Sequence, residues 1–160
     1  MTESTHTAFN AWLKYYAEEL KSAAAPKKFV KVGRFFCCPC CYLPTLKSRQ
    51  DFNICMLCDW KDDGQDDHNA DQVLGGPNRD YSLTEARQNF QQYFTMYRPA
   101  DAYDFSRTTE KPNPGSKTAY DLTKVKKEII DRYNLLMSID EPVEKKAIWK
   151  EIEVLQKKLQ

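Results

Sequence analysis

The amino-acid sequence predicts an α+β fold, in which a small β core is flanked by helices and followed by a C-terminal helical hairpin. Three observations lead to this prediction. Six cysteines lie within one 22-residue window, short extended segments border that window, and apolar residues recur at helical spacing before and after it. A chain of 160 residues can bury a hydrophobic core, so we expect residues 1–160 to form a single domain.

Two C-x2-C pairs dominate the cysteine window. Cys38 and Cys41 form the first pair, Cys55 and Cys58 form the second, and thirteen residues separate the pairs. Two short turns at this spacing can present four thiolates in a tetrahedron, which is the geometry of a structural zinc site. The sequence therefore predicts one structural Zn²⁺, with these four cysteines as its ligands.

The remaining two cysteines create a second possible register, because Cys37 and Cys40 are also separated by two residues. Pro39 directly follows Cys38, and a zinc-binding turn favours proline soon after its first ligand. This favours Cys38 over Cys37 as the first ligand. Cys37 would then end the incoming strand and Cys40 would point away from the metal, each as a small buried side chain or spare thiol. The sequence leaves open whether either one joins the metal site.

Other uses of paired cysteines fit the sequence less well. Residues 1–16 contain charged side chains and no apolar core ahead of a cleavage site, so we expect a cytoplasmic protein whose thiols stay reduced. A redox-active C-x-x-C normally begins the helix of a βαβ unit, and the sequence around Cys38 has no such pattern. Iron–sulfur ligation is a minor alternative. No stretch is long and apolar enough to span a membrane.

The segments around the cysteines predict a zinc-ribbon-like core preceded by a helix. A helix is expected within residues 6–25, because its apolar residues recur at helical spacing: Phe9, Trp12, Leu13, Tyr16 and Leu20. Residues 29–36 are rich in Phe and Val and predict an extended segment that leads into the first cysteine pair. Residues 42–46 and 52–54 supply short extended pieces that would flank the metal.

The second half of the chain predicts a loop, a capped helix and a helical hairpin. Residues 60–78 are rich in Asp, Gly and Asn and should be irregular. The motif SLTE at 82–85 is a capping box, and the helix that it begins carries an apolar stripe up to Pro99: Leu83, Ala86, Phe90, Tyr93, Phe94 and Tyr97. Residues 98–118 should form a long connecting loop.

The hairpin is predicted over residues 121–160. Two apolar stripes lie on either side of a break at 138–142, namely Val125, Ile129, Tyr133 and Leu136, then Ile148, Ile152, Leu155 and Leu159. Finely mixed charges accompany both stripes, so intramolecular packing of the two helices is expected, and partner binding or dimerisation is the alternative.

Several separated motifs resemble one known family. Residues 38–42 read CPCCY, residues 54–67 read ICMLCDWKDDGQDD, residues 76–78 read GPN and residues 82–90 read SLTEARQNF. Over residues 36–94 the chain is similar to the bacterial cysteine-rich CPCC domain family. The resemblance implies a zinc-binding domain, and because similar proteins occur beside bacterial toxins, it suggests that some members are immunity proteins.

This chain departs from the family pattern at three positions. The glycine that usually follows the first cysteine pair is replaced by Tyr42, Met56 stands where proline is usual, and Lys61 stands where glutamate is usual. These changes spare all four predicted ligands. The predicted helices at both ends lie outside the region of resemblance and are candidates for what makes this member specific.

Charge narrows the function classes. Lys and Arg total 24 against 23 Asp and Glu, whereas residues 59–80 contain seven aspartates, one lysine and one arginine. A globally neutral chain with an acidic loop beside its metal site makes nucleic-acid binding unlikely and suits a basic protein partner. We therefore predict a partner-binding acidic group that is dispensable for folding: Asp62, Asp63, Asp66 and Asp67.

An enzyme is not expected. Four cysteine ligands leave a metal no open coordination position, and His6 and His68 are the only histidines available for acid–base chemistry. The predicted function is that of an immunity protein, an antitoxin that neutralises a cognate toxin by direct binding. The alternative is a zinc-ribbon nucleic-acid-binding or regulatory protein. The sequence does not reveal the toxin or the oligomeric state.

Overall fold

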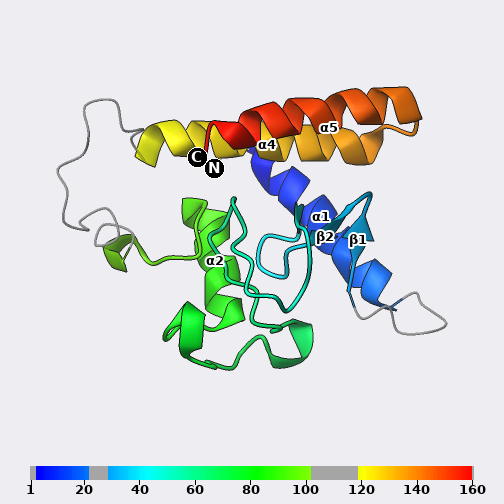
Figure 1. Cartoon of the computed structure of the whole chain (residues 1–160). Coiled ribbons are helices and arrows are strands. Elements are labelled where there is room, and N and C mark those ends of the chain that lie inside the picture. Colours follow the sequence, from blue (N-terminus) through cyan, green and yellow to red (C-terminus); the bar gives the residue numbers. More distant parts are fainter. Residues whose placement is uncertain (1–2, 22–28, 102–118, 160) are drawn as a thin grey trace. The chain divides into compact units, whose positions relative to one another are not determined.

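The structure is a computed structural model that describes residues 3–21, 29–101 and 119–159 (Figure 1). It has helices and a small three-stranded antiparallel sheet, so the predicted α+β class is confirmed. The chain divides into two compact units, residues 9–97 and residues 98–160 together with 1–8. That residues 1–160 fold as one domain stays a prediction.

The first helix, α1 (Glu3–Lys21), begins three residues before the predicted range. Its expected end near residue 25 lies outside the described residues. Trp12 and Tyr16 are one helical turn apart and both are buried, whereas Leu13 of the same predicted stripe is partly exposed. Among the side chains of α1 that the structure describes, the buried members of the predicted stripe are therefore both aromatic.

The sheet consists of β1 (Lys31–Val32), β2 (Phe35–Cys37) and β3 (Pro44–Leu46), in that order. Residues 29–36 were expected to form one extended segment, but the chain reverses between Val32 and Phe35, which pair with each other. Gly33 makes the reversal possible, since its φ of 59° lies in the left-handed region that glycine occupies without strain. The predicted segment is thus a β-hairpin, and the connection from β2 to β3 holds the first cysteine pair.

A second, shorter ribbon holds the other cysteine pair. Among the described residues of this ribbon, a single isolated β-bridge pairs Ile54 with Lys61. The predicted extended piece at 52–54 is therefore not a full strand. Backbone hydrogen bonds extend the ribbon on both sides of this bridge: the Cys55 amide donates to Trp60 O at 2.9 Å, and the Asp62 amide donates to Asn53 O at 3.0 Å. The two cysteine pairs therefore sit at the ends of two antiparallel ribbons.

The loop after the second ribbon is irregular, as predicted, apart from two single turns of 3₁₀-helix, η1 (Asp67–Asn69) and η2 (Gly76–Asn78). The helix α2 (Leu83–Tyr93) follows, and the Ser82 side chain caps it by accepting a hydrogen bond from the Glu85 amide at 3.1 Å.

The helix α2 ends earlier than its apolar stripe predicts. Phe94 takes a left-handed conformation with φ of 60°, and its amide closes the helix by donating to Phe90 O. The two rings pack edge to face with centroids 6.0 Å apart. After this turn the Met96 amide donates to Cys58 O at 2.7 Å, so a long-range contact with the second ribbon takes the chain out of the helix.

The predicted hairpin is formed by α4 (Ala119–Ser138) and α5 (Pro142–Lys157), which lie side by side (Figure 1). Its core consists of Ile129, Ile130, Tyr133, Leu136, Ile148 and Ile152. Tyr133 packs edge to face on Trp149 and accepts a hydrogen bond from Gln156 at 3.2 Å. Within the described part of the chain, no helix has the length and apolar character needed to cross a membrane.

Candidate metal centre

The first cysteine pair lies in a tight turn between β2 and β3. The Tyr42 amide donates to Cys38 O at 2.8 Å, and the Cys40 amide lies 3.4 Å from Cys38 Sγ. Tyr42 occupies the left-handed region with φ of 65°, which explains why glycine is usual at this position. A non-glycine residue costs about 1–2 kcal/mol there. The packing of the Tyr42 ring against Tyr16, with centroids 5.2 Å apart, offsets this cost.

The second cysteine pair repeats the same turn. The Asp59 amide donates to Cys55 O at 2.9 Å, and Asp59 has φ of 71°. Asp59 also accepts a hydrogen bond at Oδ2 from the Thr95 hydroxyl at 2.7 Å. Both turns therefore place a non-glycine residue in the left-handed region directly after the second cysteine, and in both the side chain of that residue makes a long-range contact.

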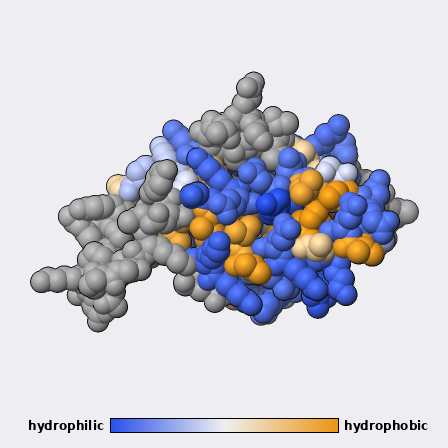
Figure 2. Space-filling view, turned by 90° about the horizontal axis from the view of Figure 1, so that it is seen from above, coloured by the Kyte–Doolittle hydropathy of each residue, from blue (hydrophilic) through white to orange (hydrophobic). Residues whose placement is uncertain are grey.

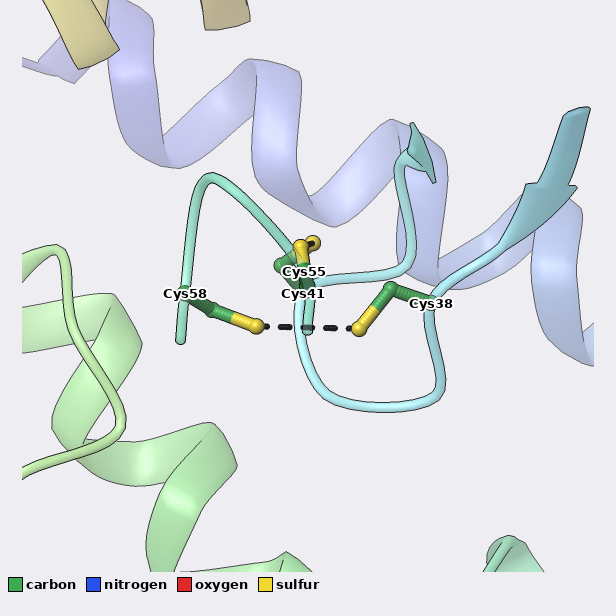
Figure 3. Close-up of side chains that lie close together, drawn as sticks. All are labelled: Cys38, Cys41, Cys55 and Cys58. Atoms are coloured by element: carbon green, nitrogen blue, oxygen red, sulfur yellow. Dashed lines mark hydrogen bonds between the residues drawn. The ribbon is translucent and has the colours of Figure 1, made fainter. Parts of the chain in front are cut away.

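Four sulfur atoms converge where the two turns meet (Figure 3). The Sγ atoms of Cys38, Cys41, Cys55 and Cys58 all lie within 4.8 Å of one another, and all four residues are free of disulfides and fully buried. The Cys38–Cys58 and Cys41–Cys55 sulfurs are 3.6 and 3.8 Å apart. Zn–S bonds of about 2.3 Å in a tetrahedron separate the sulfurs by about 3.8 Å. The donor set therefore fits a tetrahedral ion.

The family comparison agrees with this geometry. The family described as Cysteine-rich CPCC matches residues 36–110. This region is a cysteine-rich CPCC domain. No curated protein and no solved structure matches the chain at a significant level.

The buried setting of the four thiols of the CPCC domain opposes ionisation at three of them. Burial raises the pKa of Cys38, Cys41 and Cys58. Burial alone would do the same at Cys55, but hydrogen bonds to its sulfur, first from Cys38 and Cys41, hold the pKa of Cys55 below its usual range. One thiolate is thus stabilised at the expense of its neighbours, and a metal ion would allow all four to ionise.

The two other cysteines of the CPCC domain lie outside the group of four. Cys37 is the last residue of β2, and Cys40 lies within the first turn. Both are buried, and burial raises the pKa of Cys37 to about 12. A buried thiol that stays protonated behaves as a small apolar side chain. The structure thus groups the sulfurs in the register that Pro39 favoured.

Two further residues support the turns, and sequence reasoning missed both. Arg87 of α2 donates from Nε to Pro39 O at 2.8 Å, and its guanidinium lies over the Tyr42 ring at 5.0 Å. Thr45 of β3 places its hydroxyl 3.0 Å from Cys55 Sγ. The motif at residues 82–90 contains Arg87 and could have drawn attention to it, whereas no signal in the sequence marks Thr45.

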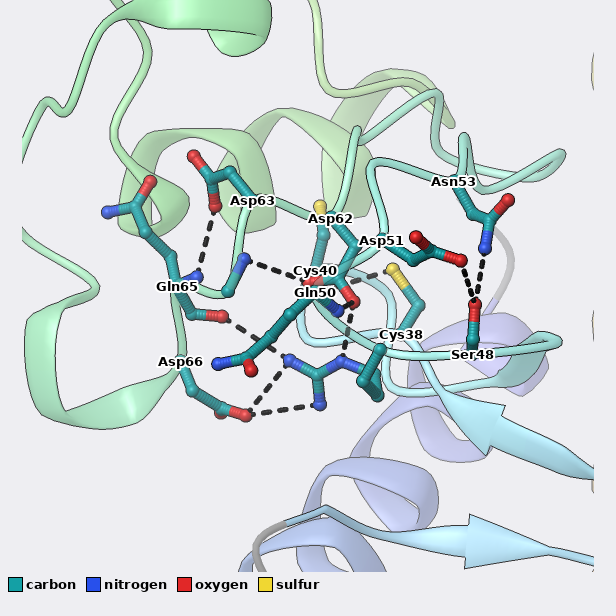
Figure 4. A network of polar contacts seen from close by, with 12 residues as sticks. Cys38, Cys40, Ser48, Gln50, Asp51, Asn53, Asp62, Asp63, Gln65 and Asp66 are labelled. Carbon is teal, nitrogen blue, oxygen red and sulfur yellow. Dashed lines mark hydrogen bonds and ion pairs between the residues drawn. The ribbon is translucent and has the colours of Figure 1, made fainter.

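Two carboxylates of the acidic loop, Asp62 and Asp66 (Figure 4), pair with the buried Arg49. Arg49 donates from Nε to Asp62 Oδ2 at 2.8 Å, and both of its terminal nitrogens lie 3.3 Å from Asp66 Oδ2. Burial opposes the charge of Arg49, but the hydrogen bond to Asp62 and the adjacent carboxylates raise its pKa. The Tyr16 hydroxyl of α1 also donates to Asp66 at 2.8 Å.

The outer carboxylates of the loop are paired as well. Asp63 accepts from the Gln65 amide at 3.0 Å and from the Asn78 side chain at 3.2 Å. Asp67, whose side chain is 50% exposed, lies 2.6 Å from an Arg87 nitrogen. Asp62 is buried and pairs with Arg49, so we expect it to contribute to folding, unlike the dispensable group of four aspartates that the sequence predicted. That the loop binds a partner stays a prediction. Because Asp67 is exposed and Asp62 is buried, Asp67 is the better candidate for contact with a partner.

Proposed function

We propose that the CPCC domain binds one Zn²⁺ through Cys38, Cys41, Cys55 and Cys58, and that this ion holds the two ribbons together. The observation that carries the proposal is the set of four buried sulfurs at tetrahedral spacing. Thiolates select soft or borderline ions such as Zn²⁺, Cu⁺ and the iron of iron–sulfur clusters. Two tight turns that converge on a single point suit one mononuclear tetrahedral ion.

The same site supports a non-catalytic role. Catalytic zinc keeps one coordination position for water or substrate, whereas four thiolates occupy every position of a tetrahedral ion. The four cysteines are also fully buried, so a substrate has no route to the ion without opening the turns. We therefore propose that the protein acts by binding and not by turnover.

We further propose that its partner is a protein, and specifically a toxin that it neutralises as an immunity protein. The surface offers apolar contacts among hydrophilic side chains (Figure 2). Val143 and Val154 of α5 are 74% and 58% exposed, and Phe52 of the CPCC domain is 61% exposed. Exposed apolar side chains beside charged ones are typical of protein interfaces. The choice of a toxin rests on the resemblance of the cysteine and SLTEARQNF motifs to the CPCC family.

Metal content tests the first proposal. Elemental analysis of the purified chain should find one zinc per molecule. Cys38→Ser should lose the ion, while the matched variant Cys37→Ser, which changes the adjacent buried thiol, should keep it. A protein that contains no zinc and takes up none when it is refolded with Zn²⁺ would overturn the proposal. Loss of zinc from Cys37→Ser but not from Cys38→Ser would assign the other register.

Co-expression tests the second proposal. The product of a neighbouring toxin-like gene should stop growth when expressed alone, and this chain should restore growth and co-purify with it at a fixed ratio. Zinc binding without any such rescue would leave the metal site intact and reject the immunity role. Sequence-selective binding of DNA or RNA by the purified chain would favour the nucleic-acid-binding alternative instead.

A further inference from the structure

We propose that the Thr45 hydroxyl donates a hydrogen bond to Cys55 Sγ and thereby stabilises Cys55 as a thiolate ligand of the metal centre. This inference rests on the proposed zinc site and deepens it by naming a positioning residue beyond the four ligands. The Thr45 Oγ1 atom lies 3.0 Å from Cys55 Sγ. That contact is shorter than the 3.4 Å from the Cys40 amide to Cys38 Sγ.

The position of Thr45 in the sheet explains how its hydroxyl reaches the sulfur. Thr45 is the central residue of β3, and side chains alternate between the two faces of a strand. Its side chain therefore points away from the face used by Pro44 and Leu46. Thr45 is buried, so its hydroxyl needs a partner within the domain.

The direction of the hydrogen bond follows from the chemistry of the ligand. A metal-bound cysteine is a thiolate with no proton to donate, so Thr45 must be the donor. The alternative acceptor for the hydroxyl is Leu43 O at 3.4 Å. The same carbonyl already accepts from the backbone amides of Cys38 and Thr45 at 2.9 and 2.8 Å. The sulfur is therefore the better acceptor for the Thr45 proton.

The Thr45 hydrogen bond matters because it stabilises negative charge in a buried site. A divalent ion with four thiolates carries two net negative charges inside a buried site, and such charge is costly without donors. The nearby guanidinium groups are directed elsewhere, because Arg49 pairs with Asp62 and Arg87 pairs with Asp67. Outer donors of this kind typically account for 10–100-fold in metal affinity.

Three variants test the role of the hydroxyl. Thr45→Val removes it at nearly constant volume, Thr45→Ser keeps it, and Thr84→Val removes a hydroxyl that contacts Asp71. Each full-length protein is loaded with Zn²⁺, and the release of the ion to an excess of chelator is followed. We expect release about 10–100-fold faster from Thr45→Val, and rates near wild type from Thr45→Ser and Thr84→Val.

Cobalt provides a readout that loss of packing would not move. In Co²⁺-loaded protein, the sulfur-to-cobalt charge-transfer band of Thr45→Val should shift to lower energy, because a thiolate without its hydrogen bond gives up an electron more easily. Thr45→Ser should keep the wild-type band. If Thr45→Val does not fold, wild-type protein loaded with ¹¹³Cd²⁺ should show a slowly exchanging Thr45 hydroxyl proton coupled to cadmium.

Each outcome bears on a different claim. If wild-type protein takes up neither Zn²⁺ nor Co²⁺, the proposed zinc site fails. If wild-type protein binds both ions while Thr45→Val has unchanged release and an unchanged band, this inference fails and the zinc site stands. Equal acceleration in Thr45→Val and Thr45→Ser, or a Thr45 hydroxyl that exchanges freely in the cadmium protein, would also overturn it.

Discussion

The CPCC domain and the helical hairpin of α4 and α5 reach order by different means. In the CPCC domain and in β1 just before it, the strands are two or three residues long, and the described loop from 60 to 78 contains only single turns of helix. The hairpin consists of helices of 20 and 16 residues with periodic apolar faces. Regular structure satisfies its own backbone, whereas irregular structure depends on specific partners for its polar groups.

Those partners are visible in the CPCC domain. A buried arginine pairs with two carboxylates, the Asn78 side chain hydrogen-bonds to both the amide and the carbonyl of Lys61, and four cysteine sulfurs converge on one point. The hairpin core is instead almost wholly apolar. We therefore expect the CPCC domain to lose its fold when one of these polar partners is removed. The hairpin should instead lose stability in proportion to the apolar surface that is no longer buried.

Removal of the proposed zinc ion should have the largest effect on stability. Cys55→Ser, or chelation of the wild-type protein, should remove ~10 kcal/mol of binding energy that stabilises the two ribbons. Hydrogen exchange should show lost protection at residues 37–60 and greater retained protection at residues 129–136 and 148–152. Equal loss of protection in both regions would show that the hairpin also depends on the ion, and would end the contrast.

Loss of the buried arginine should come next. Arg49→Met leaves Asp62 charged and fully buried without its partner, which costs about 3–5 kcal/mol. Urea denaturation would measure this loss. The double variant Arg49→Met with Asp62→Leu removes both charges and should recover part of the stability. A single variant as stable as wild type would mean that the Gln50 and Gly64 amides, which also donate to Asp62, are enough to stabilise its buried carboxylate.

A cavity in the core of the hairpin should reduce the free energy of unfolding slightly less than the loss of Arg49 does, and it should not affect zinc binding. Ile129→Ala removes a fully buried side chain, and we expect a loss of about 2–5 kcal/mol in the unfolding of the helices. Zinc content should stay at one ion per chain. Leu135→Ala, at a position that is 39% exposed, is the matched control and should change stability much less. Zinc loss from Ile129→Ala would show that the metal site of the CPCC domain depends on the apolar core of the hairpin.

The exposed edge of the acidic loop should matter least to folding. Asp67→Asn breaks a pair with Arg87 in which the Asp67 side chain is half exposed, so we expect a change of about 0–1 kcal/mol in thermal or urea unfolding. Glu18→Gln, in the exposed pair with Lys14, gives a reference for a pair that contributes little. A loss for Asp67→Asn as large as that for Arg49→Met would place Asp67 among the structural carboxylates.

The sequence was most informative where its signals were local. Two cysteine pairs, the serine cap of α2 and the two hairpin stripes each lie within a few residues, and each predicted an element that the structure contains. The early end of α2 could not be predicted, because it depends on the contact of Met96 with Cys58. Arg49 was missed for a similar reason, since its carboxylate partners lie 13 and 17 residues away.

The burial of the acidic loop shows the same limit. Seven aspartates in residues 59–80 indicate a solvated surface when composition alone is considered. The structure reverses this expectation for Asp62 and Asp66, because one guanidinium lies between them. The sequence alone does not show which distant Arg or Lys pairs with which aspartate of the loop. The buried and the exposed aspartates therefore cannot be told apart from the sequence.

The left-handed residues after each cysteine pair have a consequence for distant segments of the chain. Glycine would satisfy the backbone at Tyr42 and Asp59, yet the side chains present there reach Tyr16 of α1 and Thr95 beyond α2. Each turn thus connects a cysteine of the group of four to a distant segment of the chain. A metal ion bound by the four cysteines would therefore also fix the two residues that contact Tyr16 and Thr95, so that the positions of these segments would depend on the metal.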